Sequence, residues 1–544
     1  MMSLFEKILK SRGLTGDLRT SFLLPDYSLG YDPFYLTDMD KAIKRLVLAH
    51  KKQDTIIIYG DYDIDGLTAS TLLFDAFGSF GFKNLDIFIP NRFIEGYGMT
   101  VDAVEKIAQQ GAKLIVTVDC GGSSEKEITR ANELGVDVIV TDHHNIISKI
   151  RPSAVAVINP KNMDDKYPFK DLAGVGVAFK LIQALQSKLD GLSDGQEKWL
   201  LDLVALGTVC DTVPLIDENR TYVFWGLKVL SKTKRPGLKA LMAIAGIDPK
   251  TVNARSLGFG LGPRMNAAGR LETAKFALDM LRSCNPLEAL EKAEYLDALN
   301  KARRADQDKI FKQAARQAES YTDDSVLVVS DPDWNHGIVG IVASKLLEKY
   351  KKPTFVLQEI SGESKGSARS FGDFSIIDAI VDSKDIITHG GGHHFAAGVT
   401  MPTKNIDKFR KQVNKFYKNM KLVNQAGLLL PVADAVAELN EVTEDLIDQI
   451  KQLEPFGEGN PQPILRTNGL IVKSIRKMGA DNQHLKLGLR DSKGQLMEFI
   501  SFGAPDYFFV QPGMMVDVWY QPDVNEWRGN RTVEGRLLHI ETKE

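Results

Sequence analysis

Between about residues 54 and 160, short β-branched runs alternate with stretches of helical periodicity. Neighbouring parallel strands need a crossover, usually a helix, so this alternation predicts βαβ units. We therefore expect an α/β fold with an open, doubly wound parallel sheet. The expected strands are Thr55–Tyr59, Leu85–Ile89, Leu114–Val118, Asp137–Thr141 and Ala154–Ile158, and the expected helices lie near Leu67–Phe80, Thr100–Gln109 and Ser123–Leu134.

The remainder of the 544 residues is long enough for further domains. We expect an N-terminal segment over 1–48, the sheet domain over 49–285, a connecting helix over 286–320, a smaller α/β domain over 321–405, a basic linker over 406–426 and a barrel over 427–544. In the smaller domain we expect strands at Val326–Ser330 and Thr354–Leu357, and a helix at Ile338–Tyr350. Short strands at His484–Arg490, Gln495–Phe502, Met515–Gln521 and Arg531–Ile540 favour a five-stranded oligonucleotide-binding (OB) barrel over a sandwich.

Composition narrows the possible functions. The 68 Lys and Arg residues against 71 Asp and Glu residues give a net charge of −3, so any nucleic-acid binding must use local basic patches. The 3 cysteines include no Cys-x-x-Cys motif, which excludes a thiolate zinc site and favours a reducing cytoplasm. No window approaches the roughly 18 apolar residues of a membrane span, and we see no signal-peptide core. We expect a cytoplasmic protein with no membrane partner.

Acidic residues and histidines follow several of the expected strands. They are Asp61, Asp63 and Asp65 after the first strand, Asp119 after the third, Asp142, His143 and His144 after the fourth, and Asp211 after a helical stretch. Because ligands bind at the carboxyl ends of parallel strands, these groups should converge at one edge of the sheet. A single Asp-x-Asp is as readily an Asp-rich turn or helix cap, but this convergence favours a metal site.

The ligand types indicate which metal and which chemistry to expect. Hard oxygen ligands with an imidazole suit Mn²⁺ or Mg²⁺ better than a structural zinc ion. Two such ions about 3.5–4 Å apart can hydrolyse a phosphate ester, because one activates water and both neutralise charge on the phosphoryl oxygens. At least one carboxylate must then bridge the ions, and the residues by themselves leave open which one.

The Asp-x-Asp motif, the lone Asp119, the Asp-His-His triplet and Asp211 resemble, in order, the four motifs of the DHH phosphoesterase superfamily. The resemblance implies that Asp119 bridges the two ions and that His144 contacts the scissile phosphate. The implied metal ligands are Asp63, Asp65, Asp119, His143 and Asp211. Asp61 and Asp142 would orient these ligands. Many members have a histidine four residues before the first-motif aspartate, where this chain has Tyr59, and Asp61 is a candidate substitute.

A second set of motifs lies further along the chain. The segments 390–393 (Gly-Gly-Gly-His) and 396–398 (Ala-Ala-Gly) resemble the signature of the DHHA1 domain, the usual companion of DHH domains. We expect a glycine-rich turn there that presents backbone N–H groups and an imidazole to a phosphate. The segments 262–270, 334–341 and 454–461, together with the long helix and the barrel, resemble the RecJ family of bacterial single-strand-specific DNA exonucleases.

Several residues in these segments are candidates for binding the phosphates of a strand. They are Arg92, Arg264, His336, Ser367, Arg369, Gly391, Gly392 and His393. Surface salt bridges are the alternative role for the arginines, and helix capping is the alternative for His336. The barrel aromatics are candidates for base stacking or for the barrel core, and they are Phe499, Phe502, Trp519, Tyr520 and Trp527.

Three segments, Lys228–Lys239, Lys301–Arg316 and Lys404–Lys421, are rich in basic residues. A run of this kind is more often a solvated helix face, but three of them beside a phosphate-cleaving site suit a channel for a polyanionic strand.

The resemblance implies a metal-dependent exonuclease of DNA repair and recombination that releases 5′-mononucleotides from the 5′ end of single-stranded DNA. It also implies a single-strand-binding protein and a helicase as partners, and we expect a monomer. Residue types alone set neither the polarity nor the choice of DNA over RNA. One alternative is a DHH–DHHA1 phosphodiesterase for short RNA or cyclic dinucleotides, against which the barrel and Lys301–Arg316 argue. The other is a non-catalytic single-strand-binding scaffold, which would be expected to have lost the metal carboxylates.

Overall fold

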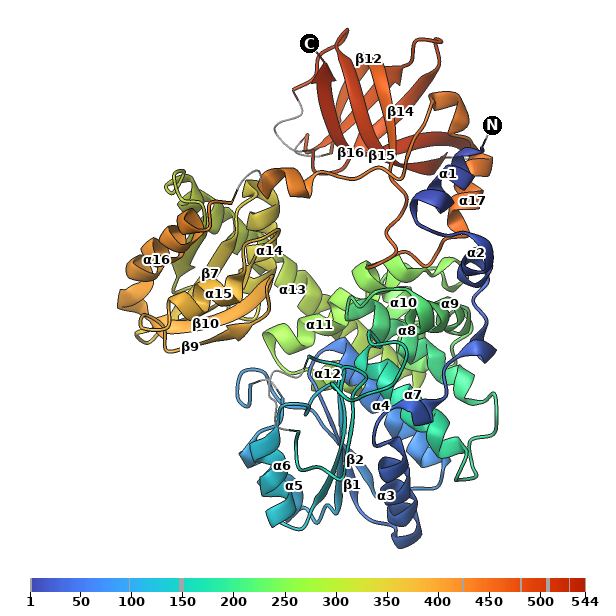
Figure 1. Cartoon of the computed structure of the whole chain (residues 1–544), viewed down its shortest axis with the longest axis vertical. Helices are drawn as coiled ribbons and strands as arrows, with labels where there is room; N and C mark the ends of the chain where they lie inside the picture. Colours follow the sequence, from blue (N-terminus) through green and yellow to red (C-terminus); the bar gives the residue numbers. More distant parts are fainter. Residues whose placement is uncertain are drawn as a thin grey trace. The chain divides into compact units, whose positions relative to one another are not determined.

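The computed structural model describes residues 2–96, 98–145, 151–422, 425–479, 482–504, 509–527 and 529–543, with the backbone alone at 425, 426 and 527. The chain divides into two compact units (Figure 1). The first comprises residues 1–269, 273–294 and 431–544, and the second comprises residues 270–272 and 295–430. No helix in the described ranges is both long enough and apolar enough to cross a membrane.

The first unit contains a five-stranded sheet in the order β2-β1-β3-β4-β5, and its strand pairs are parallel. Its strands are β1 (Ile56–Gly60), β2 (Leu85–Phe88), β3 (Leu114–Val118), β4 (Asp137–Thr141) and β5 (Ala156–Ile158). Gly60 is in register with Val118, and Val118 with Thr141, so the carboxyl ends of β1, β3 and β4 lie side by side. The expected doubly wound α/β sheet is confirmed.

Helices cover both faces of this sheet (Figure 1). On one face, α5 (Val101–Gln109) and α6 (Glu125–Glu133) pack on the strands through a shared apolar cluster. On the other face lie α3 (Met39–Lys52), α4 (Ile64–Ser79) and α7 (Gly174–Gln186). The Asp63 carboxylate caps α4 by accepting a 3.1 Å hydrogen bond from the Gly66 N–H. Because α4 begins so soon after β1, its first turn stays at the strand ends.

Between its parallel sheet and the long helix that leaves it, the first unit is mainly helical. Its helices are α8 (Leu201–Cys210), α9 (Asp217–Leu230), α10 (Pro236–Ile244), α11 (Gly262–Leu271) and α12 (Lys275–Leu281), and α13 (Pro286–Glu319) continues into the second unit. Helix α8 packs closely on α4, since a Cβ at Gly207 would lie 2.4 Å from Thr68 Oγ1. This packing brings the end of α8 to the sheet edge. The long helix matches the expected connecting helix closely.

The second unit has a mixed five-stranded sheet in the order β6-β7-β8-β10-β9. The strands are β6 (Leu327–Asp331), β7 (Thr354–Ile360), β8 (Glu363–Arg369), β9 (His389–Gly392) and β10 (Ala396–Pro402), and the helices are α14 (Val339–Tyr350), α15 (Ile376–Asp382) and α16 (Ile406–Asn419). Strands β6 and β7 are parallel, and the other pairs are antiparallel. This smaller α/β fold agrees with the expected DHHA1 domain.

Two expectations about the second unit are corrected. The glycine run 390–392 is not a turn but most of the edge strand β9, which pairs with β10. The partner strand supplies hydrogen bonds that outweigh the weak strand preference of glycine. The expected basic linker 406–426 contains helix α16, whose Phe409 and Val413 are buried in the core of this unit. Apolar residues four positions apart form one face of a helix, and the lysines occupy its exposed face.

The C-terminal part of the first unit is a closed barrel (Figure 1). Its strands are β12 (Leu465–Met478), β13 (His484–Arg490), β14 (Leu496–Ser501), β15 (Met515–Trp527) and β16 (Asn530–Lys543), with the short β11 (Ala435–Val436) beside β12. The β12–β15 pair closes the barrel. The expected OB-like barrel is therefore confirmed, although β12 was not among the predicted strands.

The N-terminal segment packs on both the barrel and the parallel sheet of the first unit. Helix α1 (Leu4–Ser11) buries Leu4, Phe5, Ile8 and Leu9 in the same apolar core as the barrel strands and α17 (Glu444–Lys451). The next helices are α2 (Gly16–Leu23) and then α3, which packs on the sheet beside β5. The expected separate segment 1–48 is thus shared between the barrel and the sheet.

Candidate metal centre

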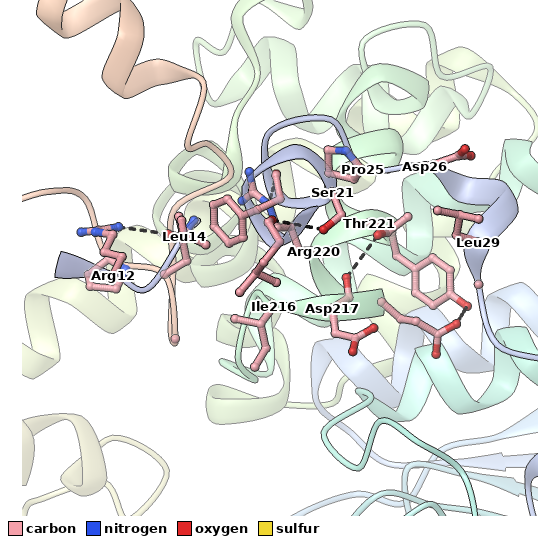
Figure 2. A pocket seen from close by; sticks show the side chains of 18 of the residues that line it. Arg12, Leu14, Ser21, Pro25, Asp26, Leu29, Ile216, Asp217, Arg220 and Thr221 are labelled. Atoms are coloured by element: carbon pink, nitrogen blue, oxygen red, sulfur yellow. Dashed lines mark hydrogen bonds between the residues drawn. The ribbon is translucent and has the colours of Figure 1, made fainter. Parts of the chain in front are cut away.

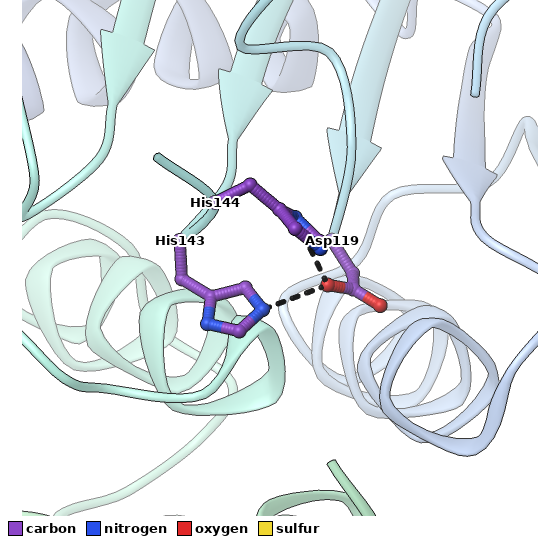
Figure 3. A group of neighbouring side chains, drawn as sticks. All are labelled: Asp119, His143 and His144. Carbon is purple, nitrogen blue, oxygen red and sulfur yellow. Dashed lines mark ion pairs between the residues drawn. The ribbon is translucent and has the colours of Figure 1, made fainter. Parts of the chain in front are cut away.

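The strand ends bring the predicted acidic residues and histidines together. Asp119 follows β3, and His143 and His144 follow the adjacent strand β4 (Figure 3). The Nε2 atom of His143 lies 3.2 Å from Asp119 Oδ1, 3.5 Å from Asp211 Oδ2 and 3.8 Å from Asp65 Oδ2. One imidazole nitrogen therefore faces carboxylates from three separate segments of the chain.

The side chains form three overlapping groups, each with its ligand atoms within 4.8 Å of one another. The groups are Asp119 with His143 and His144, Asp65 with His143 and Asp211, and Asp61 with Asp63 and Asp119. Asp119 belongs to two of them. A carboxylate shared by two groups of ligands is what a bridge between two cations requires.

Several buried polar atoms at this edge make no hydrogen bond within the part of the chain that the structure describes. Among the described residues, Asp61 Oδ1, Asp119 Oδ1, Asp211 Oδ2 and both ring nitrogens of His143 are buried and make no hydrogen bond. Leaving a buried polar group unsatisfied costs about 1–3 kcal/mol, and more for a charged group. Carboxylate oxygens with a neutral imidazole are suitable ligands for Mn²⁺ or Mg²⁺. The donor set therefore fits divalent cations.

The pKa values of the metal-free site have a clear pattern. Burial and then neighbouring carboxylates raise the pKa of Asp65 and Asp119 well above the usual range. Burial is also the main reason that the pKa of Asp61 is raised to about 8 and that of Asp211 to about 7. Burial, followed by the charge of His144, lowers the pKa of His143 to about 3. That ring is thus neutral at physiological pH, which is the form that binds metal.

Asp142 orients both histidines. Its carboxylate accepts backbone N–H bonds from Gly122 at 2.8 Å, His143 at 2.7 Å and His144 at 3.1 Å, and it lies 2.8 Å from Nδ1 of the His144 ring. Burial raises the pKa of Asp142, but the bond with His144 outweighs it and lowers the pKa to about 2. Burial opposes charge on His144, yet Asp142 raises the pKa of His144 to about 9. His144, with 41% of its side chain exposed, is therefore a cation at the open side of the metal-free site.

Helix α7 supplies groups that sequence analysis missed. The backbone N–H groups of Gly174 and Val175 donate to Asp65 Oδ2 and Oδ1 at 2.6 and 2.9 Å. A Cβ at Gly174 would lie 2.8 Å from Asp119 Cβ, so a side chain there would displace the carboxylates. The available sequence signal is the Gly-Val-Gly run that opens this helical stretch.

Tyr59 points away from the site. Its buried hydroxyl donates to Gly98 O at 3.0 Å, and its ring stacks on Phe88 with centroids 5.0 Å apart. The position where many superfamily members have histidine is therefore part of the apolar core under α5. Asp61 instead lies beside Asp63 and Asp119, and its buried Oδ1 makes no hydrogen bond among the described residues.

Two predicted phosphate-binding arginines border this edge of the sheet in the first unit. The Arg92 guanidinium carbon lies 4.2 Å from the centroid of Tyr62, within the Asp-rich motif. Arg264 lies in the first turn of α11. The start of α11 is close to the end of α8, since a Cβ at Gly262 would lie 2.8 Å from Cys210 Sγ.

Other predicted phosphate-binding residues meet at a cavity of about 460 Å³ in the second unit. Its lining residues are His336, Lys365–Ser367, His389–Gly391 and Gly398–Thr400. The cavity thus gathers the predicted His336, Ser367 and Gly391, and it adds Lys365 and His389, which the sequence analysis missed. The backbone N–H and Nδ1 of His336 contact Gln358 Oε1 at 3.0 and 3.1 Å, and α14 has no side-chain cap.

Three predicted residues are not among the described residues that line this cavity. Arg369 donates from Nη1 to Ala368 O at 2.8 Å, and burial lowers its pKa. Gly392 ends β9, and the exposed His393 closes the hairpin with a 2.8 Å backbone bond to Ala396 O.

The barrel aromatics divide between core and surface. Phe499 and Tyr520 are fully buried and Trp519 nearly so, whereas Phe502 is 61% exposed. The Trp527 side chain lies outside the described residues. Arg466 lies over the Trp519 ring, with its guanidinium carbon 4.3 Å from the centroid.

Domain models match three stretches of the chain. They are the DHH family N-terminal domain over residues 55–208, the DHHA1 domain over 323–419 and the RecJ OB domain over 433–539. A crystal structure of RecJ in complex with Mn²⁺ from Thermus thermophilus superimposes with a TM-score of 0.82 at 27% identity, covering 99% of this chain and 76% of that one. The Mg²⁺ complex from the same organism gives a TM-score of 0.77.

Two curated relatives carry the name single-stranded-DNA-specific exonuclease RecJ. The Bacillus subtilis protein is 37% identical over 92% of this chain, which spans 63% of that protein's length. The Escherichia coli protein is 35% identical over 92% of this chain and 89% of its own length. Because the match to the Escherichia coli protein covers most of both that protein and this chain, the chain belongs to the RecJ family.

Proposed function

We propose that this chain is a metal-dependent exonuclease that hydrolyses single-stranded DNA from its 5′ end to 5′-mononucleotides, in DNA repair and recombination. The observation that carries the proposal is the cluster of unpaired, buried carboxylate oxygens around His143. The family membership supports the choice of substrate, because relatives that are 35–37% identical are named for that activity.

Each group at the edge has a role in this proposal. Asp63, Asp65, Asp119, His143 and Asp211 would hold two divalent ions, with Asp119 shared between them and Asp61 as a further oxygen ligand on the Asp63 side. When bound, such ions supply activation of water and neutralise charge on the phosphoryl oxygens.

The remaining side chains act on the substrate or on the ligands. His144, held as a cation by Asp142, would contact the scissile phosphate. Arg92 and Arg264 would bind neighbouring phosphates, because guanidinium pairs well with them. The cavity that contains His336, Ser367 and Gly391 would take a terminal phosphate, and Arg369, Gly392 and His393 would support it.

The net charge of the chain is −3, so its overall charge does not attract DNA. Exposed lysines would instead contact the phosphates of the strand. In the segment 228–239 they are Lys228, Lys232, Lys234 and Lys239. We also propose a monomer in the cytoplasm, with a single-strand-binding protein and a helicase as partners, on the strength of family resemblance.

The test is digestion of a long single-stranded DNA carrying separate labels at its 5′ and 3′ ends, with Mn²⁺ or Mg²⁺ and with a chelator as control. We expect immediate release of the 5′ label as mononucleotide while the 3′ label stays on long fragments, and no cleavage with chelator. An Asp119→Ala variant should bind the DNA without cutting it. If the long strand survives while di- or trinucleotides are consumed, the proposed substrate is wrong and the short-RNA phosphodiesterase becomes the better account.

A further inference from the structure

The segment Glu454–Pro461, called here the 454–461 loop, follows α17 and leads to β12. Asn460 folds the loop on itself, because its Nδ2 donates to the carbonyl oxygens of Leu453 and Pro455, both at 2.8 Å. The backbones of Gly457 and Asn460 pair in both directions, at 3.0 and 3.2 Å. These bonds make the loop a compact element of the first unit.

Arg220 of α9, labelled in Figure 2 among the residues that line a pocket, anchors this loop. The side chain is almost fully buried, and it donates from Nη1 to Leu453 O at 3.0 Å and from Nη2 to Glu454 O at 2.8 Å. Its Nε donates to Phe22 O at 2.9 Å. One buried cation thus joins α9, the loop and the N-terminal segment.

The loop packs on the turn that begins with Asp211. Residues 211–216, called here the Asp211 turn, connect α8 to α9. The Leu215 N–H donates to Glu458 O at 2.7 Å. A Cβ at Gly459 would lie 2.9 Å from Pro214 Cβ, so the two backbones meet with no room for a side chain.

The Asp211 turn relies on contacts of this kind. Its second residue, Thr212, has a φ of 64°, a left-handed conformation that is costly for a β-branched residue and persists where surrounding contacts enforce it. On the α9 side, Asn219 Nδ2 donates to Pro214 O at 3.0 Å. The 454–461 loop supplies further contacts, to Pro214 and Leu215.

We propose that the 454–461 loop is a positioning element for the metal centre. By bracing Pro214 and Leu215 it holds the Asp211 carboxylate beside His143, where Oδ2 lies 3.5 Å from Nε2. Gly459 is then a positioning residue that acts through Asp211. The inference rests on the proposed metal site, and it links the barrel side of the first unit to the strength of metal binding.

The test compares two glycine substitutions in the full chain. Gly459→Ala introduces a Cβ against Pro214 at a φ of 68°, whereas Gly469→Ala introduces one at a φ of 66° with no described atom within 4 Å. The two variants therefore have similar backbone strain, and they differ in the contact that the new Cβ makes with Pro214. Calorimetric titration of the metal-free proteins with Mn²⁺ should show about tenfold weaker binding for Gly459→Ala, the size expected when a ligand loses its support, and unchanged binding for Gly469→Ala.

A double-mutant cycle separates positioning from general damage. In an Asp211→Asn background, Gly459→Ala should weaken Mn²⁺ binding no further, because the carboxylate it positions is gone. The inference is overturned if Gly459→Ala binds Mn²⁺ as tightly as Gly469→Ala does. It is also overturned if Gly459→Ala still weakens Mn²⁺ binding in the Asp211→Asn background. Gly457→Ala, whose Cβ would lie 2.6 Å from Leu215 Cδ1, gives the same test should Gly459→Ala not fold. Failure of the unsubstituted protein to bind Mn²⁺ would instead overturn the proposed function.

Discussion

At the scale of single residues, the metal centre concentrates negative charge that the metal-free fold tolerates poorly. Asp65 and Asp119 are each about 1% exposed, and neighbouring carboxylates raise the pKa of both after burial does. Backbone N–H groups from α7 stabilise Asp65, whereas Asp119 Oδ1 has no hydrogen bond among the described residues. We expect bound cations to relieve this repulsion, so metal and stability should be coupled.

The coupling predicts how stability depends on pH. The pKa of Asp211 is about 7 and that of Asp61 about 8 in the folded protein, above the usual 3.8. Between pH 3.8 and about 8, these two carboxyl groups bind more protons in the folded state than in the unfolded state. The metal-free protein therefore loses stability as the pH rises from about 4 to about 8. Mn²⁺ replaces those protons, and the increase in Tm that it causes should grow across this window.

Scanning calorimetry with chelator or Mn²⁺ at several pH values measures that increase. Asp119→Asn removes one of the buried charges, and its metal-free form should lose less stability with rising pH than the unsubstituted protein. An increase in Tm that is the same at both ends of the window would contradict this electrostatic account.

At the scale of elements, α1 is part of the barrel core although it lies at the opposite end of the sequence. Leu9 is 1% exposed in that core, whereas Leu18, in α2, is 57% exposed. Leu9→Ala should lower the free energy of unfolding by about 2–5 kcal/mol, as buried leucine truncations do. Leu18→Ala should change it by less than about 0.5 kcal/mol. Urea denaturation followed by circular dichroism compares the two, and equal effects would show that α1 does not stabilise the barrel.

Elements with a strong local pattern were predictable from the sequence. Strands β3, β4 and β13 have the predicted bounds, because each is a run of β-branched or alternating apolar residues between turn signals. The convergence of the acidic residues also followed, since parallel strand order determines which strand ends are neighbours. Strand β9 was not predictable from the sequence, because glycine has a weak strand preference. The segment forms a strand because it pairs with β10.

Contacts between distant segments were not predictable. Nothing local indicates that α1 packs on the barrel, that Gly174 donates to Asp65, or that Arg220 binds the carbonyls of residues 453–455. The many lysines of the segment 406–426 favour a linker, whereas the apolar face of α16 shows its role only when it packs on the core of the second unit. In each case the determining partner lies far away in the sequence, as it does for the buried Tyr59.

At the scale of the whole molecule, a slightly acidic chain must bind a polyanion through local patches. Replacing Lys228, Lys232 and Lys234 with glutamine should reduce the slope of log K against log salt concentration by about 2, because each single-strand phosphate contact contributes about 0.7. The matched control replaces Lys51, Lys52 and Lys83, which are also exposed and lie outside the three basic segments. Fluorescence anisotropy with a labelled strand measures both slopes, and an equal decrease would rule out a specific role for the 228–234 lysines.

We propose that neighbouring strand ends build a two-ion site around Asp119. Anomalous diffraction from crystals soaked in Mn²⁺ tests it most directly. We expect two peaks, one beside Asp65, His143 and Asp211 and the other beside Asp61 and Asp63, with the Asp119 carboxylate contacting both ions. A single peak, or two peaks of which Asp119 contacts neither, would contradict it.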